Sequence, residues 1–290
     1  MHNESFAINS VYNIWSYSEK LDGTNYTIKG HSRASERSSF FIPELNILLD
    51  AGLPTNFSPN LILVTHCHSD HCCSLPMVIV NIDSSVINSK IVVPKKQELM
   101  FNKSLDADYN LYMESNSYKP KYNLMGIEPN KEFEHNKLLI KTYKSDHSVN
   151  CLSYGIIEVR KKLKEEYKGL NGKELVALKK EGVVIDEKKY EKMFVYVGDT
   201  TIKILKNYPE LFEYKTIIIE CTYLFEEDEI HLENKKHIHW NLLKPYIKAN
   251  PGTYFLLIHF SLRYKNREIK EFLEKEKMEM GIDNFRPWLN

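Results

Sequence analysis

The stretch that decides the fold is Thr65-His66-Cys67-His68-Ser69-Asp70-His71-Cys72. It follows the apolar run 60–64, which comes after a proline and is typical of a fully buried strand. Residues two apart in an extended chain point the same way, so His66 and His68 can converge on one ion. Asp70 and His71 come one turn later and can address a second ion. This density of imidazole and carboxylate favours Zn²⁺ or a harder divalent metal over a set of unrelated surface histidines.

Length and charge limit the classes of protein. The 290 residues suffice for one large domain or two small ones with a sizeable core. Basic and acidic residues are equal in number, 39 each, so the average surface does not favour nucleic acid or membranes, and a polyanion would need a local basic patch. Met1–Ser10 lack the basic and apolar parts of a signal peptide, and no apolar run approaches the length of a membrane span.

Cysteine usage points to the compartment. The 5 cysteines are odd in number and form no C-x-x-C pair, which favours a reducing environment over a disulfide framework. We therefore expect a cytoplasmic protein without membrane contact. Cys67, Cys72 and Cys73 flank the histidines, either as thiolate ligands or, in the interpretation we favour, as small apolar residues behind the site.

Apolar runs bounded by turn residues predict strands that alternate with helical segments. The expected strands are 11–17, 26–29, 38–42, 46–50, 60–64, 90–94, 138–143, 151–159, 194–197, 216–220 and 254–258. Helices are expected to start near 77 and to span 99–112 and 266–280. Five strands end at a polar residue: His66, His147, Asp199, Glu220 and His259. Ligands collect at the carboxyl edge in layered α/β proteins, so these residues predict one site at that edge of two packed sheets.

Several motifs together resemble the metallo-β-lactamase fold, and within it the ribonuclease Z branch. The fold-level motifs are Thr65-His66-x-His68-x-Asp70-His71, His147, Gly198-Asp199-Thr200 and His259. The branch-level motifs are Asp146-His147-Ser148 followed by Tyr154-Gly155, Glu220-Cys221-Thr222-Tyr223, and the tail His259-Phe260-Ser261-Leu262-Arg263-Tyr264. The resemblance implies an α/β protein, an αββα sandwich of two packed mixed β-sheets with helices on the outer faces. It also implies a single hydrolase domain over 1–290, with a Lys/Glu-rich insertion at about 158–192.

The resemblance also implies a role for each motif residue. His66, His68 and His147 would hold a first metal, Asp70, His71 and His259 a second, and Asp199 would bridge the two. The implied cofactor is two Zn²⁺ ions, with Mn²⁺ or another divalent metal as the alternative, and a metal-bridging hydroxide would attack a phosphodiester. Asp70 would in addition orient the attacking water. A relay of Glu220 with a histidine would protonate the leaving oxygen, and both His237 and His239 are candidates for that histidine.

Substrate contacts are expected in two places. Arg263 follows His259 closely enough to bind a phosphate, and Ser261 is either a substrate contact or, as we favour, the cap of the helix that follows. Segment 158–192 carries more basic than acidic residues, which is typical of a phosphate-contacting strip and equally of a solvated helical face. No Gly/Pro-rich stretch of the kind that forms the transfer-RNA-gripping arm of ribonuclease Z is evident.

Three functions compete. The first is a two-metal phosphodiesterase, an endoribonuclease acting on RNA and also, as a second substrate, on single-stranded DNA. The second is a β-lactamase or another amide, ester or thioester hydrolase on the same scaffold. The third is a binding module that has lost its metals, against which the complete ligand set argues. We favour the first, and by analogy with ribonuclease Z we expect a homodimer.

Overall fold

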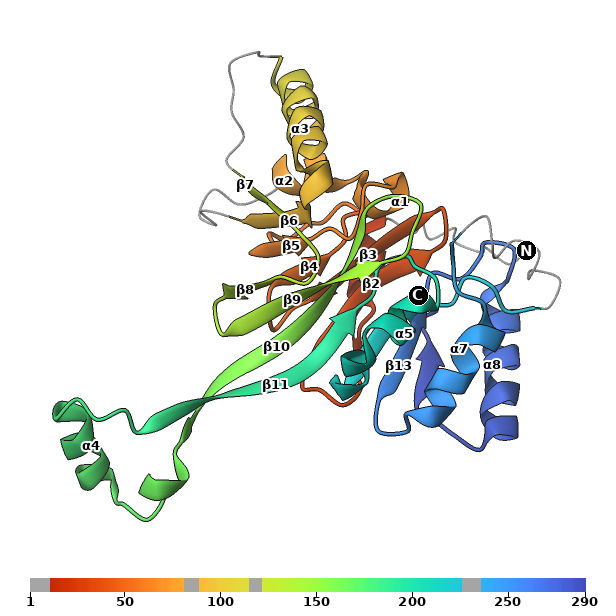
Figure 1. Cartoon of the computed structure of the whole chain (residues 1–290). Helices are drawn as coiled ribbons and strands as arrows, with labels where there is room; N and C mark the ends of the chain where they lie inside the picture. Colours follow the sequence, from red (N-terminus) through yellow and green to blue (C-terminus); the bar gives the residue numbers. More distant parts are fainter. Residues whose placement is uncertain (1–10, 81–88, 115–121, 226–235) are drawn as a thin grey trace, which may run out of the picture.

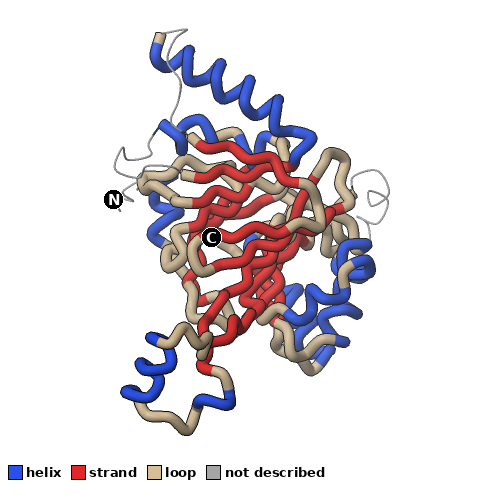
Figure 2. Tube along the Cα trace, turned by 60° about the vertical axis from the view of Figure 1, so that its left-hand side comes forward, coloured by secondary structure: helices blue, strands red, loops and turns tan. Residues whose placement is uncertain are grey.

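The computed structural model describes residues 11–80, 89–114, 122–225 and 236–290. Two seven-stranded mixed sheets pack face to face, and helices cover the outer face of each (Figures 1 and 2). This four-layer αββα arrangement confirms the predicted fold class. Met1–Ser10, where no signal peptide was expected, lie outside the described residues. No helix among the described residues is long and apolar enough to cross a membrane.

The first sheet contains the strand that leads into the histidine motif. Its strands, in spatial order, are β1 (Glu19–Lys20), β2 (Thr27–Arg33), β3 (Arg37–Ile42), β4 (Ile47–Leu49), β5 (Leu61–Leu63), β6 (Lys90–Pro94) and β7 (Asn123–Ile127). Neighbours are antiparallel from β1 to β4 and parallel from β4 to β7. Its helical elements are η1 (Val11–Ser16), α1 (Ser69–Cys72), α2 (Leu75–Val80), η2 (Lys95–Gln97) and α3 (Glu98–Met113).

The second sheet supplies the remaining site residues. Its strands, in spatial order, are β14 (Phe285–Pro287), β13 (Tyr254–Ile258), β12 (Thr216–Glu220), β11 (Asp186–Tyr196), β10 (Cys151–Leu163), β9 (Leu138–Ser145) and β8 (Glu132–His135). The strands from β11 to β14 are parallel, and β10 runs antiparallel to both of its neighbours. Its helical elements are α5 (Lys203–Asn207), η4 (Pro209–Glu213), α7 (Trp240–Ala249) and α8 (Asn266–Met280).

Strands covered on both faces explain the unbroken apolar runs in the sequence. In β5, Leu61 and Leu63 belong to the cluster between the sheets, whereas Ile62 faces the helices on the outside. In β12, Ile218 faces inward, and Ile217 and Ile219 face outward. Each strand therefore removes apolar surface from water in two layers at once, and this places the strand ends rigidly.

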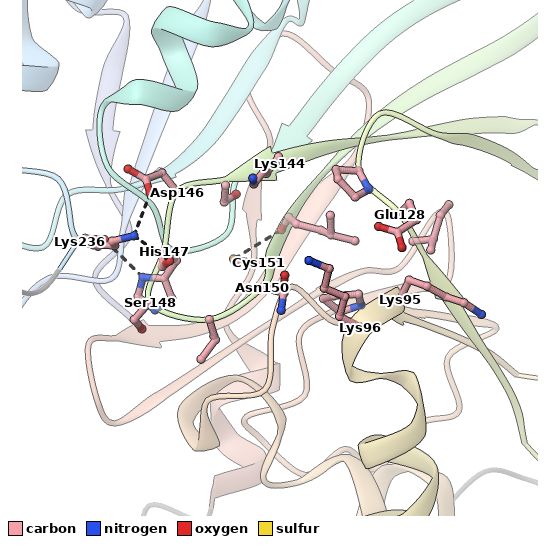
Figure 3. Close-up of a pocket in the computed structure, with 16 residues that line it drawn as sticks. Lys95, Lys96, Glu128, Lys144, Asp146, His147, Ser148, Asn150, Cys151 and Lys236 are labelled. Carbon is pink, nitrogen blue, oxygen red and sulfur yellow. Dashed lines mark hydrogen bonds and ion pairs between the residues drawn. The ribbon is translucent and has the colours of Figure 1, made fainter.

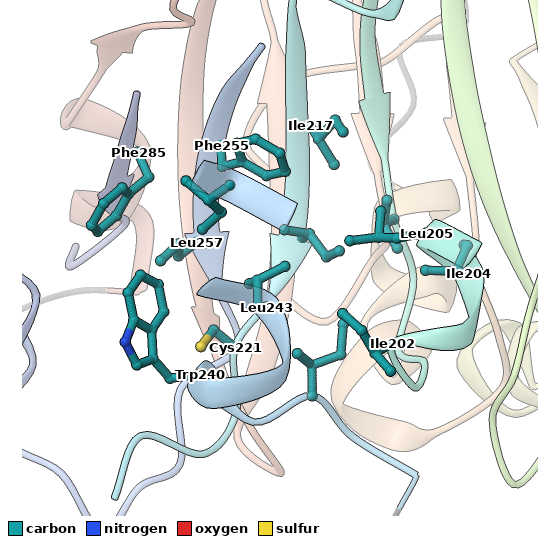
Figure 4. Packing of buried hydrophobic residues seen from close by; sticks show 14 of the residues in the cluster. Ile202, Ile204, Leu205, Ile217, Cys221, Trp240, Leu243, Phe255, Leu257 and Phe285 are labelled. Atoms are coloured by element: carbon teal, nitrogen blue, oxygen red, sulfur yellow. The ribbon is translucent and has the colours of Figure 1, made fainter. Parts of the chain in front are cut away.

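The outer cluster of the second sheet is the largest. Trp240 and Leu243 of α7 lie against Leu257 of β13 and Phe285 of β14 (Figure 4), and the rings of Trp240 and Phe285 have centroids 5.1 Å apart. The sequence analysis did not predict α7 or β14. Segment 11–17, expected as a strand, is the helical turn η1, whose Trp15 packs into the outer cluster of the first sheet and donates its Nε1–H to Pro54 O at 2.9 Å.

The Lys/Glu-rich segment at about 158–192 forms an arm that projects from the sandwich (Figure 1). The outer halves of β10 and β11 pair from Glu158 with Glu191 to Leu163 with Asp186. At the tip lie η3 (Glu165–Tyr167) and α4 (Gly172–Lys180), and α4 buries no residue. A protruding arm is thus present without a Gly/Pro-rich stretch, because two strands continue beyond the sheet. Of segment 158–192, only α4 forms the solvated helical face that the composition also indicated.

Candidate metal centre

A first group of three imidazoles lies at the carboxyl edge of both sheets. His66 and His68 follow β5, and His147 follows β9. The Nδ1 atom of His68 lies 3.1 Å from Nε2 of His66 and 3.1 Å from Nε2 of His147. Three ring nitrogens of the set that the resemblance implies therefore converge on one point.

A second group lies beside the first. Asp70 and His71 come from α1, and His259 follows β13. The Nε2 atoms of His71 and His259 are 3.4 Å apart, and Asp70 Oδ2 lies 3.6 Å from the former and 3.5 Å from the latter. Asp199, after β11, faces both groups: its carboxylate is 3.4 Å from Nε2 of His71 and of His259, and 3.9 Å from Nε2 of His66. A bridging position is therefore geometrically open to Asp199.

The spacing of these atoms fits divalent metal ions. Ligand atoms placed tetrahedrally about 2.0–2.1 Å from a metal are about 3.3 Å from one another, close to the separations within each group. Burial lowers the pKa of His66 and of His147, which keeps both rings in the neutral form that binds a metal. The donors of these groups could hold divalent metal ions, which supports the predicted class of cofactor.

The carboxylates of the second group need a compensating positive charge. Burial would lower the pKa of His71, but the carboxylates of Asp199 and Asp50 raise it well above its usual value. Burial would raise the pKa of Asp199, yet the charges of His259 and His71 hold it well below its usual range. The carboxylates therefore stay ionised. Their negative charge is balanced either by a proton on His71 or by a cation bound in its place.

Each of these rings is oriented from its far side. His71 donates Nδ1–H to Asp50 Oδ2 at 2.7 Å, His259 donates Nδ1–H to Thr222 Oγ1 at 3.2 Å, and Nδ1 of His66 lies 3.0 Å from Thr65 Oγ1. Contacts of this kind fix the tautomer, so the inward nitrogen keeps its lone pair for a metal. The backbone contributes too: His259 has a φ of 60°, a left-handed turn at the end of β13 that few non-glycine residues adopt.

Next to the two groups lies a buried acid paired with a histidine. His237 donates Nδ1–H to Glu220, with Nδ1 at 2.9 and 3.1 Å from the two carboxylate oxygens. Glu220 is fully buried and also accepts from Thr200 N at 2.8 Å and Thr222 Oγ1 at 2.5 Å. Burial would lower the pKa of His237, but the charge of Glu220 raises it to about 9. His237 is thus held protonated at neutral pH, and its ring stands 5.3 Å from those of His147 and His259.

Comparison with known proteins finds relatives in sequence and in structure. No model of a known protein family matches the sequence. The sequence is 28% identical over 255 residues to tRNase Z TRZ1 of Arabidopsis thaliana, covering 85% of this chain and 89% of that one. It is 27% identical over 258 residues to tRNase Z TRZ2, chloroplastic, of the same plant, covering 87% of this chain and 72% of the relative. In structure it is similar to the metallo-β-lactamase fold protein YhfI of Bacillus subtilis, with a TM-score of 0.57, 12% identity, and coverage of 90% and 95%.

The chain is a metallo-β-lactamase-fold protein that resembles ribonuclease Z. Its close-packed Gly-Asp-Thr motif shows how the fold places Asp199. A Cβ atom on Gly198 would lie 2.7 Å from Cys151 Sγ and 2.9 Å from Thr65 Cβ. Glycine is therefore required for β11 to approach the histidine loop of the opposite sheet closely enough to present the aspartate.

Three predicted site residues of this metallo-β-lactamase-fold chain lie outside the cluster. His239 is buried and caps α7: its Nδ1 accepts from Asn241 N at 3.1 Å, and its Nε2 donates to Phe225 O at 2.9 Å. Both ring nitrogens are thus engaged in the backbone. Arg263 is exposed, and Ser261 Oγ accepts from Arg263 N at 3.4 Å. The cap that we favoured for Ser261 is wrong, because α8 begins later, with Lys265 as its N-cap.

Of the three cysteines beside the motif, only Cys72 takes a position of the kind we favoured. Cys67 and Cys73 are exposed, whereas Cys72 is half-buried and packs against the outer cluster of the first sheet. None of them belongs to a group of metal-ligand atoms within the described residues. All five cysteines are free thiols.

The sequence analysis missed Asp50, whose carboxylate holds several of the segments that carry the metal-ligand groups. Asp50 is fully buried at the end of β4 and accepts from Thr65 N at 2.7 Å, His71 Nδ1 at 2.7 Å and Tyr196 OH at 2.8 Å. It therefore ties the histidine loop, α1 and β11 together in the metallo-β-lactamase scaffold. The only signal in the sequence is a single aspartate after a short apolar run.

Replacing Asp50 with asparagine should weaken metal binding by the second group. The amide of asparagine would point an N–H group at the donors of His71 and Tyr196, so His71 would lose the acceptor that orients its ring. The loss of such an orienting partner typically lowers metal affinity about 10–100-fold. We expect isothermal titration with a divalent metal to show this weakening. Tyr196→Phe is the matched control: it removes one donor to the same carboxylate, should cost about 1 kcal/mol of unfolding free energy, and should leave metal affinity unchanged. Equal metal affinity in wild type and Asp50→Asn would contradict the orienting role.

Proposed function

We propose that the chain is a dinuclear metal-dependent endoribonuclease. The observation that carries the proposal is the adjacency of two metal-ligand groups, spanned by Asp199, to a protonated histidine held by a buried glutamate. The sequence relatives are named tRNase Z, which supports RNA as the substrate and precursor transfer RNA as its class. The compartment we propose is the cytoplasm, supported by the free thiols; one relative is named as chloroplastic.

Seven residues would hold two divalent ions, which we propose are Zn²⁺, with Mn²⁺ as the alternative. The first site takes His66, His68 and His147, the second takes Asp70, His71 and His259, and Asp199 spans both. Bound there, two ions would lower the pKa of a water molecule and neutralise the charge that develops on the phosphate. Asp70, which accepts from the backbone N–H of Ser35 at 3.1 Å, is held in the position from which it can also orient that water.

The protein itself supplies the proton for the leaving oxygen. His237 keeps its Nε2–H for the substrate, because Glu220 engages Nδ1–H and keeps the ring charged and fixed. An RNA sugar oxygen is a poor leaving group and needs this proton as its bond to phosphorus breaks. Thr222 links the acid to the second metal group, because it donates to Glu220 and accepts from His259. Movement of the metal ligand and of the acid is therefore coupled through one hydroxyl.

We further propose a single domain in which segment 158–192 is an insertion that binds the body of the RNA. Arg160, Lys161 and Lys162 lie on the arm where β10 leaves the sheet, and the arm projects well clear of the sandwich (Figure 1). We also propose a homodimer, by analogy with ribonuclease Z, to be checked by light scattering after size exclusion. A β-lactamase, amide, ester or thioester hydrolase is the competing function. If a chromogenic β-lactam had a higher kcat/KM than RNA, the endoribonuclease proposal would be wrong.

Metal content tests the proposed function directly. Protein purified without chelator should contain about two divalent ions per chain, since each group offers three ligands and shares a fourth. Chelation should lower the melting temperature and abolish RNA cleavage, because ions that bind only the folded state stabilise it. Adding back Zn²⁺ or Mn²⁺ should restore both properties. A titration that saturates at one ion per chain would rule out the dinuclear mechanism.

A further inference from the structure

A basic pocket lies beside the first metal-ligand group. It has a volume of 360 Å³, and its lining joins His147 and Lys236 to Lys144 and to the segment after β6 that carries Lys95 and Lys96 (Figure 3). The proposed mechanism uses none of these lysines. His147 forms part of its wall, so the pocket adjoins the first metal-ligand group.

Two of the lysines have charge to offer to a ligand. Lys236 donates to Asp146 at 3.1 Å, as does Lys203, and Lys95 pairs with Glu98 at 2.5 Å, so these cations are already partnered. Among the described residues, Lys96 and Lys144 form no ion pair, and both are exposed. Figure 3 shows Lys96 pointing towards Asn150, with Lys144 across the pocket from it. The two free ammonium groups therefore face a common space.

The rest of the lining suits a nucleotide. Pro94, Ile127 and Val149 give the pocket an apolar surface against which a base or ribose can pack, and Ser148 and Asn150 add hydrogen-bonding groups. A volume of 360 Å³ is at the lower end of the range for small-ligand sites, about 300–1,000 Å³. The pocket therefore accepts a single strand and is too small for a duplex.

We propose that this pocket, the Lys96–Lys144 pocket, binds the single-stranded RNA that flanks the scissile phosphate, with Lys96 and Lys144 on its backbone phosphates. The inference rests on the proposed endoribonuclease function. It adds the path that the RNA strand takes away from the metal-ligand groups. Phosphate contacts hold a strand without reading its sequence, so the pocket fixes register and not base identity. It makes cleavage depend on an unpaired stretch next to the cut.

The test reverses both charges. Lys96→Glu/Lys144→Glu should raise KM for a short single-stranded RNA about tenfold. It should also reduce the slope of log KM against log salt concentration by the contribution of about two phosphate contacts. Hydrolysis of bis-(nitrophenyl) phosphate should stay at the wild-type rate, because that substrate has no flanking nucleotides. Lys96→Arg/Lys144→Arg should behave as wild type. Lys270→Glu/Lys275→Glu on α8 is the matched control with the same charge change, and it should leave KM near the wild-type value.

Shortening the RNA locates the contact. When the flank on one side of the cut is trimmed to one nucleotide, wild type and the charge-reversed variant should become equal. The pocket assignment would be overturned if wild type and variant still differed after either side was trimmed. It would also be overturned if the variant had an unchanged KM for the intact RNA, or if it lost equal activity on RNA and on bis-(nitrophenyl) phosphate. If wild type hydrolyses bis-(nitrophenyl) phosphate but not RNA, the endoribonuclease proposal fails by itself. Binding of the intact single-stranded RNA, labelled with a fluorophore, then tests the pocket assignment, and equal Kd values for wild type and the charge-reversed variant would refute it.

Discussion

Replacing Asp199 with asparagine should remove RNA cleavage and one metal ion together. Asp199 is the only carboxylate in the described part of the chain that lies within 4.0 Å of histidines from both groups, His71 and His259 on one side and His66 and His147 on the other. Losing one ion removes several kcal/mol of transition-state stabilisation, and each 1.4 kcal/mol is tenfold, so the rate should fall by about 10³-fold or more. Elemental analysis and RNA cleavage on the same sample measure both effects.

Asparagine is chosen because it keeps the volume and one acceptor oxygen, so the buried position is not left as a cavity. The exposed Asp283, whose carboxylate pairs with Lys277 at 2.7 Å, provides the control: Asp283→Asn should keep two ions and full activity. Full metal content with lost activity in Asp199→Asn would show that Asp199 acts on substrate or water and is not a bridge. Full activity would remove it from the site.

His66, Asp199 and His259 could be predicted because each comes soon after an apolar run that is buried on both faces. Such a run leaves no choice about where the chain emerges, so His66, Asp199 and His259 had to meet at one edge. Asp50 could not be predicted in this way. Its partners Thr65, His71 and Tyr196 lie 15, 21 and 146 positions away, and only the packing of the two sheets brings them to one carboxylate.

Two other features were ambiguous in the sequence for physical reasons. The arm was missed because its strands are built mostly from charged residues, and their pairing depends on the continuation of β10 and β11 from the buried sheet. His237 and His239 could not be separated, because they are two positions apart after the same strand. What separates them is the start of α7: the residue before Trp240 becomes the helix cap, and its ring is turned into the backbone.

His237→Ala should separate two substrates by their leaving groups. Without the proton from His237, RNA cleavage should fall about 10²–10⁴-fold, whereas hydrolysis of bis-(nitrophenyl) phosphate should stay near wild type, because nitrophenolate leaves without protonation. The pH profile gives a second readout. The pKa of His237 is raised to about 9, so the acid is present below that pH, and wild-type kcat/KM on RNA should fall as the pH rises through about 9. His237→Ala should lack this fall.

The control for this prediction is the neighbouring histidine. His239→Asn keeps a side-chain oxygen to cap α7 but loses the bond to Phe225 O, so it should lower the melting temperature and leave both activities and the pH profile intact. Metal analysis of His237→Ala decides between acid and ligand, since a ring nitrogen of His237 lies within 4.8 Å of ligand atoms of His147 and Asp199. Two ions with a selective loss on RNA identify the proton donor. Fewer ions, with equal losses on both substrates, would make His237 a metal ligand, and the leaving oxygen would then take its proton from water.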